Sequence, residues 1–460
     1  MIAPIHREFV YTANTQIKNF VIPKAAIHSA QLKTCYRTLG SIDYEPTATM
    51  VDDLIAEISR SELKDINTPV SASITDVQHL TSYNWIEAPR VTPTIAVPGS
   101  PDLWSPPNGP FRLEKDTGHV YIAQNAARYP ESPLEPLFRA LYVSHPSFNV
   151  ASIDVVTDRN NIRKLLSLTN PRWSSYKRED FTIQVEVTNN TAIFCREETK
   201  TEEYIGPNKF RGYGHSFEKK CTSRQVSGST GHHRIISYSF GGLKFIVRYE
   251  TDGYVGIVGA QLSLQPAGNQ APDVDDLSSV LDSLSLSPQS SSAGKTYSDS
   301  SKLIIRKEGQ VVPLPSILEI KTRVSHKPLA FEDVVSQLWV SQTPKLVRAY
   351  HNRGVFPVPK VEDVVVQVKA WEDQNQDDLR MLAGLIGKIR DIVKEGGGRA
   401  ILKYDASGDN LVFHKLGGKQ MLPKGLYAKW ESNDDKGTGL DVEIAGQSNK
   451  KTESAVRRET

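Results

Sequence analysis

Two pairs of charged residues have the spacing that a metal-dependent hydrolase needs. Glu250 and Asp252 lie two residues apart in YETD, and Glu319 and Lys321 lie two residues apart in LEIKTR. Residues i and i+2 of a β-strand point to the same face, so each pair would project together. Gathered carboxylates repel one another unless a cation lies among them, and oxygen ligands favour Mg²⁺ or Mn²⁺ over zinc. The pattern predicts a divalent-metal pocket that contains a lysine.

Such a pocket suits the hydrolysis of phosphate esters and anhydrides. Divalent ions activate a water and screen the charge that develops on phosphate, while a nearby lysine orients the nucleophile or neutralises the transition state. Either pair alone is more often a solvated charge pattern on an exposed strand. The case for a site therefore depends on the four short sequences taken together: GYGHSFE, YETD, LEIKTR and SQLWVSQTPKLVRAYH.

The segments that must position these residues are predicted to be strands and helices in alternation. Period-two apolar runs predict strands over 181–187, 192–195, 243–254, 317–322 and 345–351, and residues 331–341 have helical character. A strand with an acid, a strand with ExK, a helix and a further strand follow in the order of a PD-(D/E)XK-like nuclease core. We therefore expect an α/β (α+β) fold with a mixed central β-sheet flanked by helices.

Composition shifts predict three regions. Residues 1–83 are predicted to be an N-terminal decorating region, with a helix over 51–63 from the spacing of Leu54, Ile55, Ile58 and Leu63. Residues 84–431 are predicted to form the nuclease-like domain. The Ser-rich stretch 265–301 is expected to be a disordered insertion in it, and 432–460 a disordered tail, because both are too polar to offset their ordering entropy.

Composition also excludes several classes of protein. The 460 residues include 55 Lys plus Arg and 53 Asp plus Glu, so the chain is not a wholly basic nucleic-acid binder. Three cysteines without a CxxC pair disfavour a disulfide framework or a zinc ribbon. The apolar runs are too short to span a membrane. His232 and His233 would face opposite sides of a strand without a carboxylate partner, so we assign them to a surface loop. We expect an intracellular protein.

These sequences resemble the motifs of the DXO family of RNA decapping and 5′-end-processing exonucleases, over roughly residues 98–372. The acids and the lysine of the family's GYxFE, ExD and ExK motifs are matched, in that order, by Glu218, by Glu250 and Asp252, and by Glu319 and Lys321. Gln337 matches a helical glutamine, and Arg159 in TDRNN matches the arginine of a WRG motif. The chain departs from the family's patterns at Asp158, Asn160 and His215, which implies an altered pocket for the RNA 5′ end.

The resemblance implies a fungal, nuclear protein, with a cytoplasmic pool also expected. One or two Mg²⁺ or Mn²⁺ ions would be held by Glu218, Glu250, Asp252, Glu319 and the Ile320 carbonyl. Lys321 and Gln337 would position the attacking water against the substrate, and Arg159 would hold a phosphate. The implied reaction removes a cap, an incomplete cap or a 5′ triphosphate from RNA, with 5′-to-3′ degradation to follow. The implied partners are RNA 5′ ends and a 5′-to-3′ exoribonuclease, and no membrane.

Two alternatives stay open. The first is a non-catalytic protein of the same fold that binds RNA or stabilises an exoribonuclease. The complete acidic set with Lys321 speaks against it, because a scaffold gains nothing from concentrating buried like charges. The second is a nuclease of this fold that acts on DNA, from which contacts to the 2′-hydroxyl would distinguish an RNA enzyme.

Overall fold

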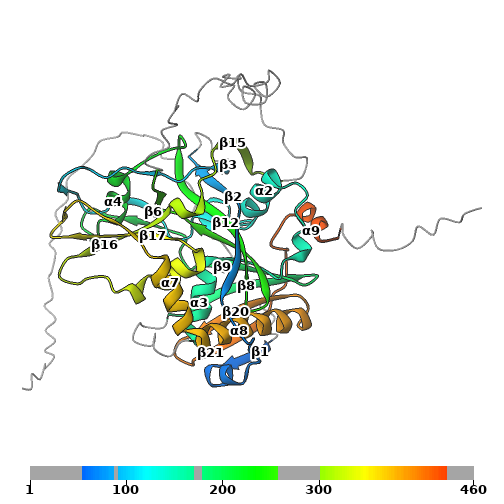
Figure 1. Ribbon diagram of the computed structural model, residues 1–460. Helices are drawn as coiled ribbons and strands as arrows, with labels where there is room; N and C mark the ends of the chain where they lie inside the picture. Colours follow the sequence, from blue (N-terminus) through cyan, green and yellow to red (C-terminus); the bar gives the residue numbers. More distant parts are fainter. Residues whose placement is uncertain (1–53, 88–91, 170–178, 257–300, 432–460) are drawn as a thin grey trace, which may run out of the picture. The chain divides into compact units, whose positions relative to one another are not determined.

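The computed structural model describes residues 54–87, 92–169, 179–256 and 301–431, and all statements below concern these ranges (Figure 1). The tail predicted for 432–460 lies outside them. So does the insertion predicted for 265–301, apart from Ser301, and so do the first 53 residues of the predicted N-terminal region.

Most of the described strands belong to one large mixed sheet. It has eleven strands in the order β1 (Leu54–Ser59), β21 (Asn410–Lys415), β20 (Arg399–Asp405), β8 (Phe181–Thr188), β9 (Thr191–Glu197), β7 (Val155–Asp158), β13 (Leu243–Glu250), β12 (Ser229–Phe240), β2 (Ile74–Ile86), β3 (Thr94–Gly99) and β15 (Ile304–Gly309). The strands β9, β7 and β13 are adjacent and mutually parallel, and the pairs on either side of them, β8 with β9 and β12 with β13, are antiparallel.

A second sheet of six strands holds the other predicted motif strands. Its order is β11 (Thr222–Ser223), β4 (Leu103–Trp104), β14 (Gly253–Tyr254), β16 (Ile317–Val324), β17 (Lys345–His351) and β19 (Val361–Asp363). Two ribbons complete the described strands, β6 (Gly118–Tyr121) with β10 (Glu202–Ile205) and β5 (Phe111–Arg112) with β18 (Val355–Phe356).

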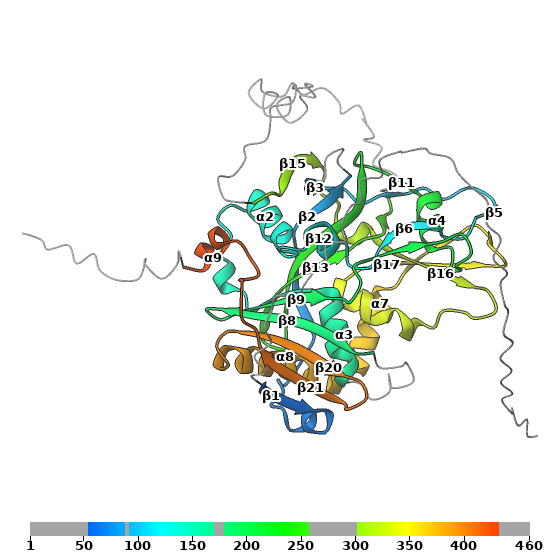
Figure 2. The ribbon, with the colours of Figure 1, turned by 180° about the vertical axis from the view of Figure 1, so that it is seen from behind.

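Helices cover both faces of the large sheet (Figures 1 and 2). The described helices are α1 (Gln124–Arg128), α2 (Glu135–Ser144), α3 (Arg159–Thr169), α4 (Gly214–Cys221), α6 (Val335–Ser341), α7 (Val365–Gln374), α8 (Gln376–Glu395) and α9 (Lys424–Glu431). Phe245 and Val247 of β13 pack into a core with α3 and α8, while Ile246 packs into a second core with α2 and α9. This alternation explains why β13 is apolar throughout, since both of its faces are buried.

The predicted fold class is confirmed, with two large sheets in place of one central sheet. The chain passes between them at the ExD motif. The single strand predicted over 243–254 is interrupted. β13 ends at Glu250, and the chain crosses through Thr251 and Asp252 into β14. In β14, Gly253 pairs with Leu318 of β16. The crossing therefore places the ExD residues next to the ExK strand.

The predicted boundary at residue 83 is wrong, and so is the predicted helix over 51–63. Residues 54–59 form β1, which pairs antiparallel with β21, and a short 3₁₀ turn follows at Arg60–Asp65. The strand β2 lies inside the large sheet between β12 and β3. β-Branched Ile55 and Ile58 suit a strand as well as a helix, and pairing with a segment more than 350 residues away decided between them. The described part of the N-terminal region is thus part of the sheet.

The assignment of His232 and His233 to a surface loop is also wrong. Both lie in β12 and are buried. The two rings face opposite sides of the sheet, as the spacing predicted, and find uncharged partners there. His232 Nδ1 lies 2.9 Å from the Asn84 side-chain oxygen, and His233 Nε2 lies 3.0 Å from that of Gln124. A pair of buried neutral imidazoles replaces the expected solvated ones.

Because of the buried histidines, we expect the protein to lose folding stability in mild acid. Burial, together with the charge of Arg234, lowers the pKa of His79 to about 4 and holds the pKa of His232 well below its usual range. A lowered histidine pKa means that the unfolded chain binds the proton more readily, so stability falls as the pH drops below about 6.5. For His79 alone the loss by about pH 4 is about 2 to 3 kcal/mol.

Urea unfolding at about pH 7.5 and about pH 4.5 measures this loss. His79→Gln should reduce the difference between the two free energies of unfolding. The exposed His326 provides the matched control, and His326→Gln should leave that difference as in the wild type. Equal pH dependence in wild type and His79→Gln would contradict the assignment.

No helix of the described ranges is long and apolar enough to cross a membrane.

Candidate active site

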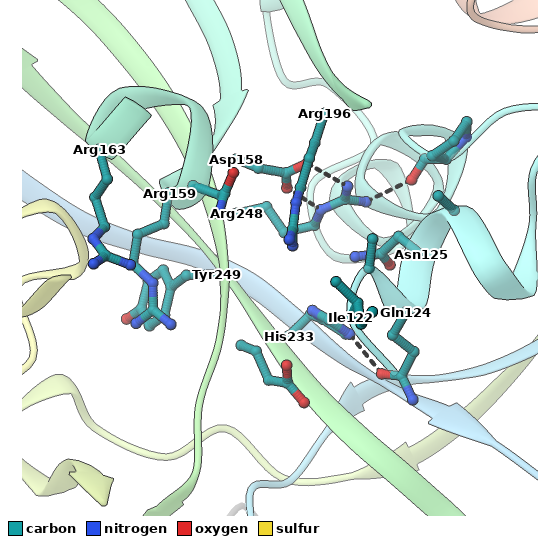
Figure 3. A pocket seen from close by; sticks show the side chains of 15 residues that line it. Ile122, Gln124, Asn125, Asp158, Arg159, Arg163, Arg196, His233, Arg248 and Tyr249 are labelled. Atoms are coloured by element: carbon teal, nitrogen blue, oxygen red, sulfur yellow. Dashed lines mark hydrogen bonds and ion pairs between the residues drawn. The ribbon is translucent and has the colours of Figure 1, made fainter. Parts of the chain in front are cut away.

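A pocket opens where the three parallel strands of the large sheet end. The strands β9, β7 and β13 are adjacent and parallel, so their carboxyl ends meet at one edge of the sheet, which is the usual place for a ligand in such sheets. The pocket there has about 680 Å³ of space, part of it open to solvent. It is lined by Ile122, Ala123, Gln124, Asn125, Ala126, Pro133, Asp158, Arg159, Asn160, Arg163, Arg196, His233, Arg248, Tyr249 and Glu250 (Figure 3).

Three partly exposed arginines give the pocket its positive wall. Arg159 and Arg163 lie one turn apart on α3, and Arg196 comes from the end of β9. Arg159 also lies over the ring of Tyr249, with 5.5 Å between the guanidinium carbon and the ring centre. Burial and the charges of Arg159 and Arg196 lower the pKa of Arg163 to about 10, against a partly compensating effect of Glu319. Arg159 is paired with Glu319 and Arg196 with Glu198 at 2.7 Å, so the remaining guanidinium N–H groups of the wall are the donors that an anion would meet.

A fourth arginine is structural. Arg248 of β13 is buried and donates two hydrogen bonds to the carboxylate of Asp158, at 2.7 and 2.9 Å. It also donates to the backbone oxygen of Pro133 at 2.7 Å. Asp158 stands where the resembling family has a tryptophan, so this departure replaces an aromatic side chain by a buried ion pair at the pocket floor.

Glu319 is the centre of the predicted motif residues. It is almost fully buried, and its Oε1 accepts hydrogen bonds from Lys321 Nζ and from Gln337 Nε2. Its Oε2 accepts from Arg159, with 3.2 Å between the atoms. Burial opposes ionisation of Glu319, but the charges of Lys321 and Arg159 outweigh burial and lower its pKa to about 2. Residues from β16, α6 and α3 are thereby brought together.

Asp252 lies beside Glu319 because the crossing between the sheets ends there. Its Oδ2 accepts a hydrogen bond of 2.7 Å from the backbone nitrogen of Ile320. Burial and the negative charge of Glu319 hold the pKa of Asp252 well above its usual range, although Lys321 acts in the opposite direction. Within the pair the negative charge is therefore favoured on Glu319 over Asp252.

Glu250 and Glu218 complete the acidic set. Glu250 is exposed on the open side of the pocket, and partial desolvation by the surrounding protein and the charge of Glu218 raise its pKa. Glu218 is half-buried on α4 and lies 3.8 Å from His215. The neighbouring Glu218 carboxylate raises the pKa of His215. Glu218 thus favours the cationic form of His215, which stands where the resembling motif has a tyrosine.

One positioning residue of α4 was absent from the sequence prediction. The carboxylate of buried Asp116 accepts hydrogen bonds from the backbone nitrogens of His215 and Ser216, at 3.3 and 2.9 Å. These nitrogens have no partners within the helix, because they belong to its first turn. Asp116 lies about a hundred residues earlier in the chain, so no local pattern indicated that it holds the helix of Glu218.

The chemistry of the donor set fits a hard divalent cation. Four carboxylates lie within electrostatic reach of one another, and the pKa values of two of them, Glu250 and Asp252, are raised in part by the others. In the described ranges, however, no three acidic, histidine or cysteine side chains already converge as metal ligands. The reason is visible at Glu319, whose oxygens face Lys321, Gln337 and Arg159. The protein's own cations supply the counter-charge in this conformation.

The structure places all of the predicted site residues in one region, and it adds residues that the sequence prediction missed. The additional pocket residues come from α1, α3, β9 and β12, and they are Gln124, Asn125, Arg163, Arg196 and His233. Arg163 had a signal in the sequence, because it follows Arg159 by four residues on a helix and so shares its face. The others had none, since α1, β9 and β12 are segments far apart in the chain.

Comparisons with known proteins found similar solved structures and one family model. No curated protein matches this sequence. Solved structures similar to this one include Rai1 from S. pombe in complex with 3′-FADP, with 12% identity, a TM-score of 0.47, and coverage of 79% of this chain and 99% of that one. Rai1 from Scheffersomyces stipitis in complex with (3′-NADP)⁺ and calcium has 11% identity, a TM-score of 0.48, and coverage of 80% and 98%. Rai1 from Candida albicans in complex with pU5-Mn²⁺ has 11% identity, a TM-score of 0.45, and coverage of 82% and 99%.

Rai1 is a protein of the DXO family, which is the family that the sequence motifs resemble. A family model also matches the sequence itself. The model described as Domain of unknown function (DUF8563) matches residues 53–429, from β1 to α9. The match includes every predicted site residue and β1 and β2 as well. This chain therefore belongs to the DUF8563 family.

Proposed function

We propose that this protein is a metal-dependent hydrolase that acts on the 5′ ends of RNA. The reaction is the removal of a cap, an incomplete cap or a 5′ triphosphate, with 5′-to-3′ degradation as a further activity. One observation carries the proposal: the four carboxylates lie directly beside a pocket whose wall is formed by Arg159, Arg163 and Arg196. Groups that bind a divalent cation and groups that bind phosphate thus share one site, as phosphoryl chemistry requires.

The carboxylates would hold one or two Mg²⁺ or Mn²⁺ ions. The ligands are Glu218, Glu250, Asp252, Glu319 and the Ile320 carbonyl, and the bound ion supplies water activation and neutralisation of developing charge. Lys321 and Gln337 already donate to Glu319, so they are held at the edge of the acidic set, where they can orient a water. Arg159 bridges the two halves of the site, because its guanidinium contacts Glu319 and lines the pocket.

The test is product release from defined RNA ends. Purified protein is incubated with 5′-triphosphate, capped and 5′-monophosphate RNAs, with Mg²⁺, with Mn²⁺ and with EDTA. We expect release in either metal and none in EDTA. A DNA strand of the same sequence separates the DNA nuclease alternative, because contacts to the 2′-hydroxyl favour RNA. Absence of release from every end in both metals would contradict the proposal.

Metal binding should also be visible as stabilisation. A cation that binds only the folded protein adds about 2.7 kcal/mol at a concentration about a hundred times its Kd. We expect Mn²⁺ to raise the melting temperature, EDTA to reverse the shift, and the shift to vanish in a variant with Glu250→Gln and Asp252→Asn. An equal shift in this variant would place the bound metal elsewhere.

A second candidate is a non-catalytic RNA-binding protein of the same fold. The observation that favours it is the ion pairing of Glu319, whose charge is already balanced by Lys321 and Arg159. The two candidates differ in the Mg²⁺ and Mn²⁺ arms of the assay: a binding protein retains RNA there without releasing product, as it does in EDTA.

We further propose a nuclear location, with a cytoplasmic pool, and association with a 5′-to-3′ exoribonuclease that would consume the 5′-monophosphate product. These proposals follow from the motif resemblance and from the chemistry of the product. Co-purification with a tagged chain from nuclear and cytoplasmic fractions tests both.

A further inference from the structure

The Asn125 side chain lines the pocket, and its amide oxygen accepts two hydrogen bonds from buried side chains. Its Oδ1 accepts a hydrogen bond of 2.6 Å from the hydroxyl of Tyr83 and one of 2.8 Å from the indole nitrogen of Trp85. Both donors come from β2, on the same face of the strand, and both are fully buried. Asn125 itself is only partly buried, on α1.

These contacts determine which way the amide group points. An indole N–H can only donate, so the atom that faces Trp85 must be the oxygen of Asn125. The planar amide then directs its nitrogen away from β2. Figure 3 shows this nitrogen on the pocket side, toward the space between Asn125 and Arg196. Within the described ranges, this nitrogen donates no hydrogen bond to a protein acceptor.

A chain of buried groups keeps the amide in this orientation. Asp158 holds Arg248, and Arg248 NH1 donates to the Tyr83 hydroxyl at 3.2 Å, so the hydroxyl proton is directed to Asn125. Burial also raises the pKa of Tyr83, which keeps it protonated. The donor is therefore prepared before a ligand arrives, and a ligand need not supply the cost of ordering it.

The surroundings of the amide nitrogen select an anion. Arg163 and Arg196 line the same pocket, with Arg196 Nε donating to Glu198 at 2.7 Å and its other guanidinium nitrogens left as donors. Both oxygens of Asp158 are occupied by Arg248, and the other lining carboxylate, Glu250, lies on the open side. A group that binds here meets donors from several sides. Among the groups of an RNA 5′ end, the phosphate is the one that offers several charged acceptor oxygens at once.

We infer that Asn125 is a specificity-determining residue that donates a hydrogen bond to a phosphate oxygen of the RNA 5′ end. The inference rests on the proposed function for the identity of the ligand. It adds a neutral, preoriented donor to the arginines, and it assigns Tyr83 and Trp85 as positioning residues that act through Asn125. The prediction is that this protein distinguishes a 5′ phosphate from a 5′ hydroxyl, and that the distinction depends on Asn125.

Binding without turnover tests the inference separately from catalysis. A short oligouridylate labelled with fluorescein at its 3′ end, with a 5′ phosphate or a 5′ hydroxyl, is titrated with protein in EDTA and followed by anisotropy. Wild type should bind the 5′-phosphate form more tightly. In Asn125→Asp an oxygen replaces the donor and adds negative charge, so the 5′-phosphate preference should fall by about 10- to 100-fold. Tyr83→Phe loosens the amide and should reduce the preference by about 2- to 10-fold.

Matched controls exclude a loss of folding. Asn125→Asp is nearly isosteric and keeps an oxygen for Tyr83 and Trp85, so its melting temperature should stay close to that of the wild type. Asn108→Asp adds the same charge at an exposed position outside the pocket lining and should leave the preference unchanged.

Two results would overturn the inference: a wild type that binds both ends equally, or an Asn125→Asp variant that keeps the full preference. If RNA is bound with an Asn125-dependent 5′-phosphate preference but is never hydrolysed, the inference stands and the proposed hydrolysis fails.

Discussion

Replacing Glu250 by Gln and Asp252 by Asn should abolish hydrolysis of RNA 5′ ends and at the same time raise the thermal stability of the metal-free protein. The pKa values of both carboxyls are raised, first by removal from water and then by neighbouring carboxylates, so their ionised forms are unfavourable in the fold. The neutral, isosteric amides relieve this repulsion. They also remove two proposed metal ligands, which should lower the rate by on the order of 10³-fold or more.

The stability gain has a predicted pH dependence. A carboxyl whose pKa is raised in the fold binds its proton more tightly there, so stability is lost as the pH rises through the raised value. The difference in melting temperature between variant and wild type, in EDTA, should therefore grow as the pH rises through the raised pKa values of the two carboxyls. A double variant at exposed acids, Glu114→Gln with Glu308→Gln, is the matched control for net charge. Full hydrolysis in the Glu250 and Asp252 variant, or a lower melting temperature, would contradict the assignment.

Removing Glu319 should have the largest effect on folding. Glu319→Ala leaves Arg159, Lys321 and Gln337 without their shared acceptor in a buried position. Breaking a buried ion pair from one side costs about 3 to 5 kcal/mol, because the remaining charge has no counter-charge. Denaturant unfolding at neutral pH measures this cost, and hydrolysis should be lost together with stability.

Lys321→Met separates the two consequences. The Lys321 side chain is 34% exposed, and its removal leaves Glu319 with the charge of Arg159 and the amide of Gln337. We expect a smaller loss of stability, about 1 kcal/mol, with hydrolysis still lost because the proposed water-orienting group is gone. If Glu319→Ala unfolds at the same denaturant concentration as Lys321→Met, Glu319 does not act as the common acceptor of the cluster.

The motifs themselves could be read from the sequence because they depend on short-range geometry. The two-residue spacing of Glu319 and Lys321 places both on one face of any strand, and in β16 the lysine does bond to the glutamate. The strand β17 is another local result, since its predicted bounds, 345–351, are those in the structure. Alternation and β-propensity are properties of neighbouring residues, so a sequence states them directly.

The two-residue spacing of Glu250 and Asp252 also led to a correct prediction that they lie near Glu319, but for a different reason. The expected continuous strand is interrupted, and the two residues flank the crossing from the large sheet to the six-stranded one. Asp252 lies beside Glu319 because Gly253 pairs with Leu318, and that pairing joins segments 65 residues apart. Local spacing carries no information about which strand will be the partner.

What the sequence by itself determined is the set of residues that can do the chemistry: four carboxylates, a lysine, a glutamine and an arginine. What only the tertiary structure decided is the pocket beside them. Arg163, Arg196 and Asn125 come from α3, β9 and α1, and the carboxyl ends of parallel strands bring them together. It also decided that residues 54–59 are a strand, through pairing with β21. Both results depend on contacts between distant segments, whose free energy outweighs local preference and leaves no periodic trace in the chain.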